Sequence, residues 1–177
     1  GLNGLAIVDH NTIGGGLEGI KINKQEDFIV ICGAEIATDK GEIIGLFLTE
    51  EIKSRHALEV IDEIKSQDGI SIIPHPFKRT RKIYENLLKE IDGIEGFNAR
   101  SNLYENTLAQ KVATMHNLPM TGGSDAHFYF EIGHGMLVFE DAIDVKNLKK
   151  GILHTQARSK LIGTSSSRYV EPLSQII

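Results

Sequence analysis

Short apolar runs alternate along this chain with segments whose apolar residues recur at helical spacing. Two continuous apolar runs, residues 5–8 and 28–32, predict strands buried on both faces, as in a parallel sheet, and the largely apolar residues 70–73 and 93–97 are predicted to be strands as well. A turn signal at residues 39–41 precedes the run at 41–48, so we expect this strand to form a hairpin or a locally antiparallel edge. Residues 136–139 are predicted to be the last strand.

Four segments are predicted to be helices: residues 53–67, 84–91, 104–117 and 144–153. In the third of these, Leu108, Val112 and Met115 form one stripe and are expected to lie in the core. Strands that alternate with helices predict an α/β layer or barrel architecture. We find no interdomain linker and expect a single domain across residues 1–177.

Composition narrows the class of protein. The 177 residues are 41% hydrophobic and 24% charged, which suits a globular domain with a sizeable core. A formal net charge of -5 argues against a broad non-specific nucleic-acid surface, although a nucleotide or a single strand stays open as substrate. Cys32, the only cysteine, lies in an apolar run and is expected in the core of a protein from a reducing compartment. No apolar run approaches the roughly 18 residues of a transmembrane helix, so we expect a cytoplasmic protein with no membrane partner.

Polar side chains collect where the predicted strands end. Asp125 and His127 are two residues apart in an extended segment, so both can reach one ion, although they could equally cap a following helix. His75 stands between two prolines that would fix its imidazole, with a plain turn as the alternative. In a barrel the strand ends surround one mouth, and their polar residues converge there. The converging set is Asp9, His10, Glu35, His75, Asp125 and His127, with Asn98 and Arg100 nearby.

So many carboxylates and imidazoles would repel one another or lack partners without a metal. Nitrogen and oxygen ligands without a thiolate suit Zn, Mn or Fe at more than one position, with Mg also possible. A basic run that includes Lys78 and Arg79 follows the predicted His75 site; such a run is usually a solvated surface, but beside a metal it could hold a phosphate. Residues 128–130, all aromatic, are expected to cover or rim the site.

Four motifs occur in a fixed order: Val8-Asp9-His10-Asn11, Gly33-Ala34-Glu35, Pro74-His75-Pro76 and Gly123-Ser124-Asp125-Ala126-His127. Together they resemble the PHP (polymerase and histidinol phosphatase) family of metal-dependent phosphoesterases, and residues 96–101 resemble the PHP-associated C-terminal segment of its small members. The resemblance covers nearly the whole chain and implies a distorted (β/α)7 TIM-like barrel with a centre of two or three divalent metal ions. It implies as metal ligands His10, Glu35, His75, Asp125 and His127. Glu35 would bridge two ions, and Asp9 would either ligate or orient a neighbour.

One motif of the family, His-x-His at the end of the first strand, is absent. The sequence also opens at Gly1 without methionine, on residues that look like a turn feeding a strand. We therefore expect a chain truncated at its N-terminus, with the first strand of the barrel and part of one metal position missing, and we leave open whether these residues alone are active.

Our hypothesis for function is hydrolysis of a phosphate ester. A hydroxide bridging two metals would attack phosphorus in line, with Asp9 and Arg100 as catalytic residues and Arg79, Asn98 and Arg100 binding the substrate. A nucleotide, an oligonucleotide end and a small phosphomonoester all stay open. Two alternatives are an amidohydrolase-type metal hydrolase and a non-catalytic PHP-like subunit of a nucleic-acid-processing complex. The first usually relies on a carboxylated lysine or additional histidines, and no lysine lies at a strand end here.

Overall fold

The computed structural model describes residues 1–78, 82–139, 147–154, 159–165 and 168–170. The chain divides into two compact units. Unit 1 comprises Gly1–Ile73 and Tyr84–Ile91, and unit 2 comprises Pro74–Ile83 and Asp92–Ile177. Both mix helices and strands, which gives the chain a mixed α/β fold, while the distorted (β/α)7 barrel stays a prediction. Among the described residues, no helix has the length and apolar character that crossing a membrane requires.

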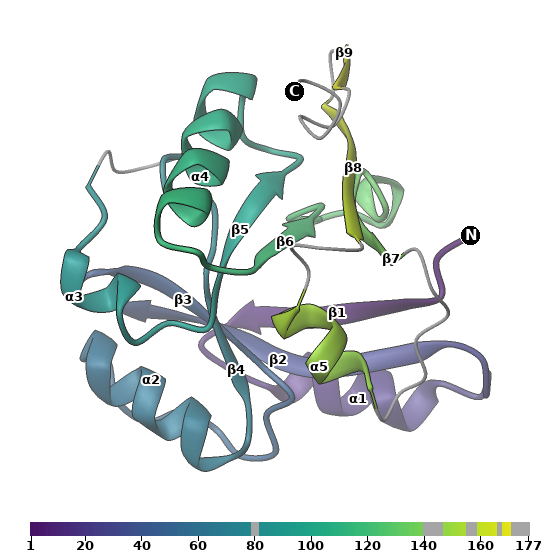
Figure 1. The fold of residues 1–177 in the computed structure, drawn as a ribbon. Coiled ribbons are helices and arrows are strands. Elements are labelled where there is room, and N and C mark those ends of the chain that lie inside the picture. The colour runs from purple at the N-terminus through teal and green to yellow at the C-terminus, as the bar shows by residue number, and fades with distance from the viewer. Residues whose placement is uncertain (79–81, 140–146, 155–158, 166–167, 171–177) are drawn as a thin grey trace. The chain divides into compact units, whose positions relative to one another are not determined.

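In unit 1, four neighbouring strands of a β-sheet pair in both parallel and antiparallel directions (Figure 1). These strands are β1 (Gly4–His10), β2 (Ile29–Thr38), β3 (Gly41–Leu46) and β4 (Ile70–Ile73). β1 pairs with β2 in parallel, whereas β3 pairs antiparallel with both β2 and β4. The predicted hairpin is therefore confirmed, but β3 lies between two strands and not at an edge.

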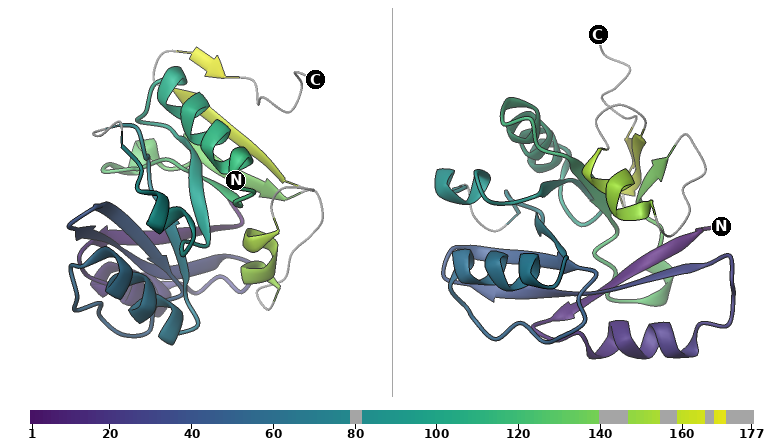
Figure 2. Two further views of the ribbon diagram at one scale, coloured as in Figure 1. Left: turned by 60° about the vertical axis from the view of Figure 1, so that its left-hand side comes forward. Right: turned by 60° about the horizontal axis from the view of Figure 1, so that its bottom comes forward.

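Three helices belong to unit 1: α1 (Gly14–Ile22), α2 (Ala57–Ser66) and α3 (Glu85–Leu88). In Figure 2, α2 packs on β3 and β4, and α1 packs on β1 and β2. The amphipathic helix predicted at residues 53–67 is confirmed as α2, with a later start. Asp39 accepts a hydrogen bond from the Ala57 N–H (2.8 Å), and Glu63 accepts one from the Lys53 N–H (2.7 Å), so the residues before Ala57 are held outside the helix.

Helix α1 was not predicted, because its first turn is Gly14-Gly15-Gly16 and glycine is a poor helix former. Packing explains why the helix forms there. A Cβ built on Gly16 would lie 2.7 Å from Cys32 Sγ, closer than atoms in contact allow, so only glycine lets α1 approach β2 at this point. Cys32 itself is buried, as expected, and its Sγ lies 3.6 Å from the Ile13 carbonyl oxygen.

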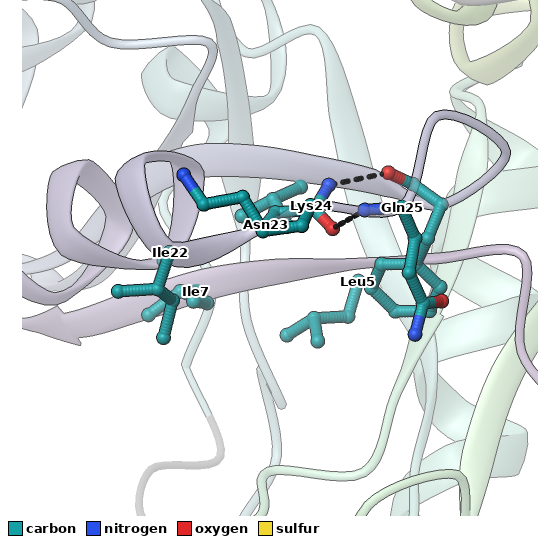
Figure 3. Close-up of a pocket in the computed structure, with 9 residues that line it drawn as sticks. Leu5, Ile7, Ile22, Asn23, Lys24 and Gln25 are labelled. Atoms are coloured by element: carbon teal, nitrogen blue, oxygen red, sulfur yellow. Dashed lines mark hydrogen bonds between the residues drawn. The ribbon is translucent and has the colours of Figure 1, made fainter.

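A cavity of about 480 Å³ lies between α1 and the β1–β2 pair (Figure 3). Its lining is largely apolar and includes Leu5, Ile7 and Val30. Asn23 closes one side, since its amide donates to the Phe28 carbonyl oxygen (2.7 Å) and its Oδ1 accepts from the Gln25 N–H (3.0 Å). None of the residues that were predicted to carry chemistry lines this cavity.

The buried face of α2 contributes to the stability of unit 1. Ile64 is fully buried, so Ile64→Ala is expected to lower the free energy of unfolding by about 2–5 kcal/mol through lost burial and the cavity it leaves. Leu58 is on the same helix with 40% of its surface exposed, and Leu58→Ala should cost less than about 1 kcal/mol. Urea unfolding followed by circular dichroism measures both variants. Equal losses would show that α2 does not pack through this face.

Unit 2 is built on the parallel pair β5 (Gly93–Asn98) and β6 (Met120–Gly123), with α4 (Leu103–Met115) packed on β5. A capping box of Asn102 and Glu105 starts α4. The predicted core stripe on this helix is wrong at Met115, which is 80% exposed. The buried face instead carries Asn106, Ala109 and Ala113, because Asn106 exchanges two hydrogen bonds with the backbone of Asn98 on β5.

The described part of unit 2 continues after β6 with a short 3-10 helix, η1 (Tyr129–Glu131). It contains β7 (Gly135–Phe139), α5 (Leu148–Leu153), β8 (Ser159–Ser165) and β9 (Arg168–Val170). β8 pairs antiparallel with both β7 and β9, so the prediction that residues 136–139 form the last strand is wrong. The predicted helix at 144–153 is seen from Leu148, and residues 144–146 lie outside the described part of the chain.

Candidate metal-binding residues

In unit 1, two of the predicted ligands lie together. His10 ends β1 directly opposite Glu35 on β2, and the His10 Nδ1 to Glu35 Oε2 distance is 3.4 Å. Glu42 on β3 joins them, so that one ligand atom from each of the three residues lies within 4.8 Å of the others. The register explains this: Glu35 faces Ile44, and Glu42 is two residues from Ile44, hence on the same face of the sheet.

This donor set fits a divalent cation. One imidazole nitrogen and two carboxylate oxygens form the mixed set that Zn, Mn and Fe accept, and a cation offsets the repulsion between two neighbouring carboxylates. Glu35 is 8% exposed, so its charge has little access to water, whereas His10 and Glu42 leave the cluster open to solvent on one side. Glu42 was missed in the sequence, because a lone acid at the start of an apolar strand, directly after a turn, normally marks a solvent-facing position.

Asp9 does not join this cluster. Successive side chains of a strand point to opposite faces, and the Asp9 carboxylate packs over Gly15 of α1, on the face away from His10. Asn11 closes the end of β1: its N–H donates to the Glu35 carbonyl oxygen (2.9 Å), and its Oδ1 accepts from the Ala37 N–H (3.0 Å). Asn11 has a φ of 60°, a conformation that asparagine tolerates better than most residues.

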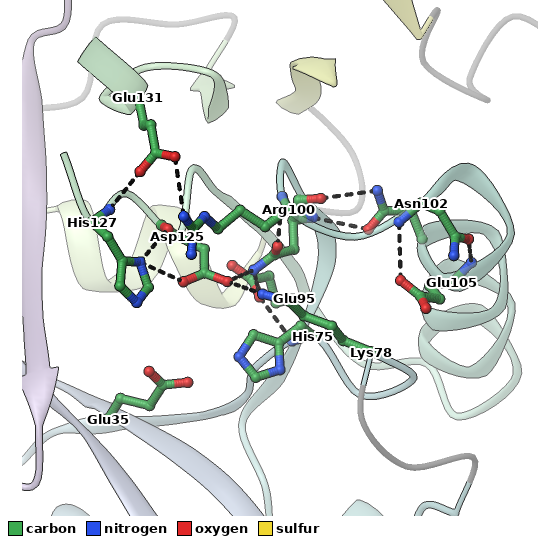
Figure 4. Close-up of polar contacts among 12 residues, drawn as sticks. Glu35, His75, Lys78, Glu95, Arg100, Asn102, Glu105, Asp125, His127 and Glu131 are labelled. Carbon is green, nitrogen blue, oxygen red and sulfur yellow. Dashed lines mark hydrogen bonds and ion pairs between the residues drawn. The ribbon is translucent and has the colours of Figure 1, made fainter. Parts of the chain in front are cut away.

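Unit 2 holds the other predicted ligands, centred on Asp125 (Figure 4). Asp125 Oδ2 accepts from Lys78 Nζ (2.5 Å) and from Asn98 Nδ2 (3.3 Å), while its Oδ1 lies 3.6 Å from His127 Nδ1. Burial alone would raise the pKa of Asp125. The hydrogen bond and charge of Lys78 outweigh it, helped by Asn98 and His75, so the pKa falls below its ordinary value and the carboxylate stays ionised.

His75 and Asp125 share an unusual backbone conformation. Neither is glycine, yet their φ angles are 24° and 49°. Such conformations cost about 1–3 kcal/mol each and persist where the surroundings impose them, often at functional sites. For His75 the restraint is visible: its N–H donates to Glu95 Oε2 (2.8 Å), and prolines flank it on both sides.

Glu95 is a buried acid that the sequence analysis did not identify. It lies on β5, 6% exposed, and its Oε2 accepts from the His75 N–H and from Asn98 Nδ2 (3.0 Å). Burial raises the pKa of the Glu95 carboxyl, although the hydrogen bonds from Asn98 and His75 oppose the shift. Glu95 therefore fixes the loop of His75 and orients the Asn98 amide that reaches Asp125. Its signal in the sequence was an acid inside an otherwise apolar strand.

Arg100 and His127 are joined through Glu131. Arg100 Nη2 lies 3.2 Å from Glu131 Oε1, and Glu131 Oε2 accepts from the N–H groups of His127 (2.8 Å) and Phe128 (3.1 Å). The His127 N–H is the main cause of a lowered pKa at Glu131, and the Phe128 N–H and Arg100 act in the same direction. Of the other predicted substrate-binding residues, Asn98 is buried against α4, and Arg79 lies outside the described residues.

The structure thus gathers the predicted residues in two groups, one in each unit. The unit 1 group is His10 and Glu35, with Glu42 added. The unit 2 group is His75, Asn98, Arg100, Asp125 and His127, with Lys78, Glu95 and Glu131 added.

Known proteins resemble this chain in sequence and in fold. The family model described as PHP-associated matches residues 104–153. The uncharacterized protein MJ1587 of Methanocaldococcus jannaschii is 43% identical over 117 residues, which are 63% of this chain and 68% of that protein. The uncharacterized protein MJ0417 of the same organism is 37% identical over 147 residues, 77% of this chain and 57% of that protein.

A solved structure shares the fold. It is a two-domain protein from Bacteroides vulgatus that contains a predicted PHP-like metal-dependent phosphoesterase, and its TM-score with this chain is 0.75 at 18% sequence identity. The match covers 92% of this chain and 56% of that one, so the chain corresponds to about half of the longer protein.

Proposed function

The chain belongs to the PHP family of metal-dependent phosphoesterases, with its PHP-associated C-terminal segment, and from this premise we propose that it hydrolyses a phosphate ester with the help of bound divalent cations. The observation that carries the proposal is the cluster of His10, Glu35 and Glu42, whose ligand atoms lie within 4.8 Å of one another. Two carboxylates this close together repel each other, and a bound cation would offset that repulsion.

Two groups of residues are proposed to hold the cations. His10, Glu35 and Glu42 form the first, and His75, Asp125 and His127 form the second. Two or three ions, Zn, Mn or Fe, suit these donors, with Mg as a further candidate. Bound to these residues, such an ion supplies an activated water at neutral pH and neutralises charge on the phosphoryl oxygens.

The remaining residues are proposed to bind and orient the substrate. Arg100 has the planar, two-pronged guanidinium that matches a phosphate, and Glu131 holds it at the end of the His127 loop. Lys78 provides a second cation beside Asp125, and Arg79, next in the chain, is proposed to contact the phosphate as well. Asp9 lies over α1, which favours an orienting role at the end of β1 over metal ligation.

Metal removal and reloading test the proposal. The protein would be stripped with a chelator and reloaded separately with Mn, Zn, Fe or Mg. Release of phosphate from phosphomonoesters would then be assayed, with cyclic amides as the comparison substrates. We expect hydrolysis of phosphate esters only after reloading, and elemental analysis should find bound metal. Hydrolysis of cyclic amides alone would instead point to an amidohydrolase, and a protein that binds no metal would end the proposal.

A further inference from the structure

Three consecutive aromatic side chains follow His127 and lie in solvent. Phe128, Tyr129 and Phe130 are 59%, 87% and 61% exposed. We call these three residues the aromatic turn. Large apolar side chains grouped at the surface are uncommon in proteins without a binding role for them, so the aromatic turn calls for an explanation beyond packing.

The rings of the aromatic turn are already arranged for stacking. Phe128 and Phe130 lie parallel, with an interplanar angle of 3° and ring centroids 5.4 Å apart, and Tyr129 meets the Phe130 ring edge-on at 5.6 Å. Because both phenylalanines are more than half exposed, ring surface remains open for a further planar group to extend the stack.

The same contacts that hold His127 and Arg100 also hold the aromatic turn. Glu131 accepts from the backbone N–H groups of His127 and Phe128, donates its own N–H to the Phe128 carbonyl oxygen (3.0 Å), and pairs with Arg100. The stacked rings, a proposed metal ligand and the proposed phosphate-binding guanidinium are therefore fixed to one carboxylate. A ligand that carries both a phosphate and a flat ring would meet these features on two loops of unit 2, which the ion pair of Arg100 and Glu131 joins.

We propose that the aromatic turn stacks on a planar ring of the substrate, so that the phosphoester is a nucleotide whose phosphate lies toward Arg100. This inference rests on the proposed function and narrows its substrate class. Stacking uses the face that every base has, so the aromatic turn would select nucleotides as a class without choosing among the bases. A phosphorylated sugar or amino alcohol, in contrast, would leave these rings unused.

Binding and turnover of paired ligands test the inference. Adenosine 5′-monophosphate and ribose 5-phosphate share the phosphate and the sugar and differ in the base, and a 5′-phosphorylated dinucleotide separates an oligonucleotide end from a free nucleotide. The variants are Phe128→Leu and Phe130→Leu, with Phe130→Tyr as the ring-preserving change. Tyr104→Leu is the matched control, because Tyr104 is 66% exposed on α4 and outside the loop. Calorimetry on the metal-loaded protein measures affinity, and phosphate release measures kcat/KM.

We expect Phe130→Leu to weaken binding of adenosine 5′-monophosphate roughly 10-fold or more, the effect of losing one aromatic stacking partner. Ribose 5-phosphate should bind equally to all variants. Phe130→Tyr should bind adenosine 5′-monophosphate more tightly than Phe130→Leu because it keeps the ring, and Tyr104→Leu should behave as the wild type. Equal affinity of the wild type for the two ligands, or an equal loss for both in the leucine variants, would overturn the inference. Ring-dependent binding without turnover of any phosphoester would support stacking on the base and reject the proposed function. Turnover of both ligands that the leucine variants leave unchanged would support the proposed function and reject the stacking.

Discussion

Replacing Asp125 with asparagine is expected to lower metal-dependent hydrolysis by roughly 10²-fold or more while the protein stays folded. The substitution keeps the shape of the side chain and an oxygen that accepts from Lys78 and Asn98, but it removes the negative charge that a cation requires. It also leaves the Lys78 ammonium, 22% exposed, without its ion-pair partner at 2.5 Å. Initial rates of phosphate release, with bound metal determined by elemental analysis, measure the effect.

Asp62→Asn is the control for this variant. Asp62 is an exposed aspartate on α2, so the same chemical change there should leave rates and metal content as in the wild type. Thermal unfolding of the two variants separates a local change of charge from a loss of fold. If Asp125→Asn hydrolyses phosphate esters at the wild-type rate with its full metal content, Asp125 has no role as a ligand.

Glu35→Gln is expected to reduce the metal bound per chain and, with it, the rate of hydrolysis by about 10²-fold. Glu35 is the most buried of the three residues His10, Glu35 and Glu42, so water has little access to replace its carboxylate as a ligand. Calorimetric titration of the stripped protein with Mn or Zn measures the affinity. Glu42→Gln should change the affinity in the same direction but less, because Glu42 is more open to solvent.

The stability of Glu35→Gln relative to the wild type should differ between the metal-free and the metal-loaded protein. With a chelator present, the variant should be at least as stable as the wild type, because one of two neighbouring carboxylates has become neutral. With saturating metal, the wild type should gain stability from binding and the variant should gain little. A variant that is equally destabilised in both conditions would indicate a packing role for Glu35 in place of metal binding.

Much of the fold is predictable from apolar runs. The runs at residues 28–32, 70–73 and 93–97 correspond to β2, β4 and β5, because a strand buried on both faces has no polar alternation to confuse the pattern. Helix α1 and strand β8 escaped prediction for opposite reasons. α1 forms in spite of its glycines because close packing on β2 requires them, and β8 has few consecutive apolar residues and depends on pairing with β7 and β9.

The candidate site was predictable only where its signal is local. A histidine between prolines, or an aspartate two residues before a histidine, can be recognised without a structure. Glu42 lies beside Glu35 because of the register of the β2–β3 hairpin, and Glu131 pairs with Arg100, which is 31 residues away in the sequence. A short sequence motif cannot reveal either contact. Glu95 had a local signal, an acid in an apolar strand, but its partners become evident only when β5 and the His75 loop are placed together.

The contact between Gly16 and Cys32 has a practical consequence. Cys32 is the only sulfhydryl in the chain, 4% exposed beneath α1, and burial together with the charge of Glu51 raises the pKa of its thiol. A maleimide or disulfide reagent therefore reaches this sulfur only during moments when α1 lifts from β2. The rate of covalent labelling, followed by mass spectrometry in native buffer, reports how often that local separation occurs, with no competing cysteine to correct for.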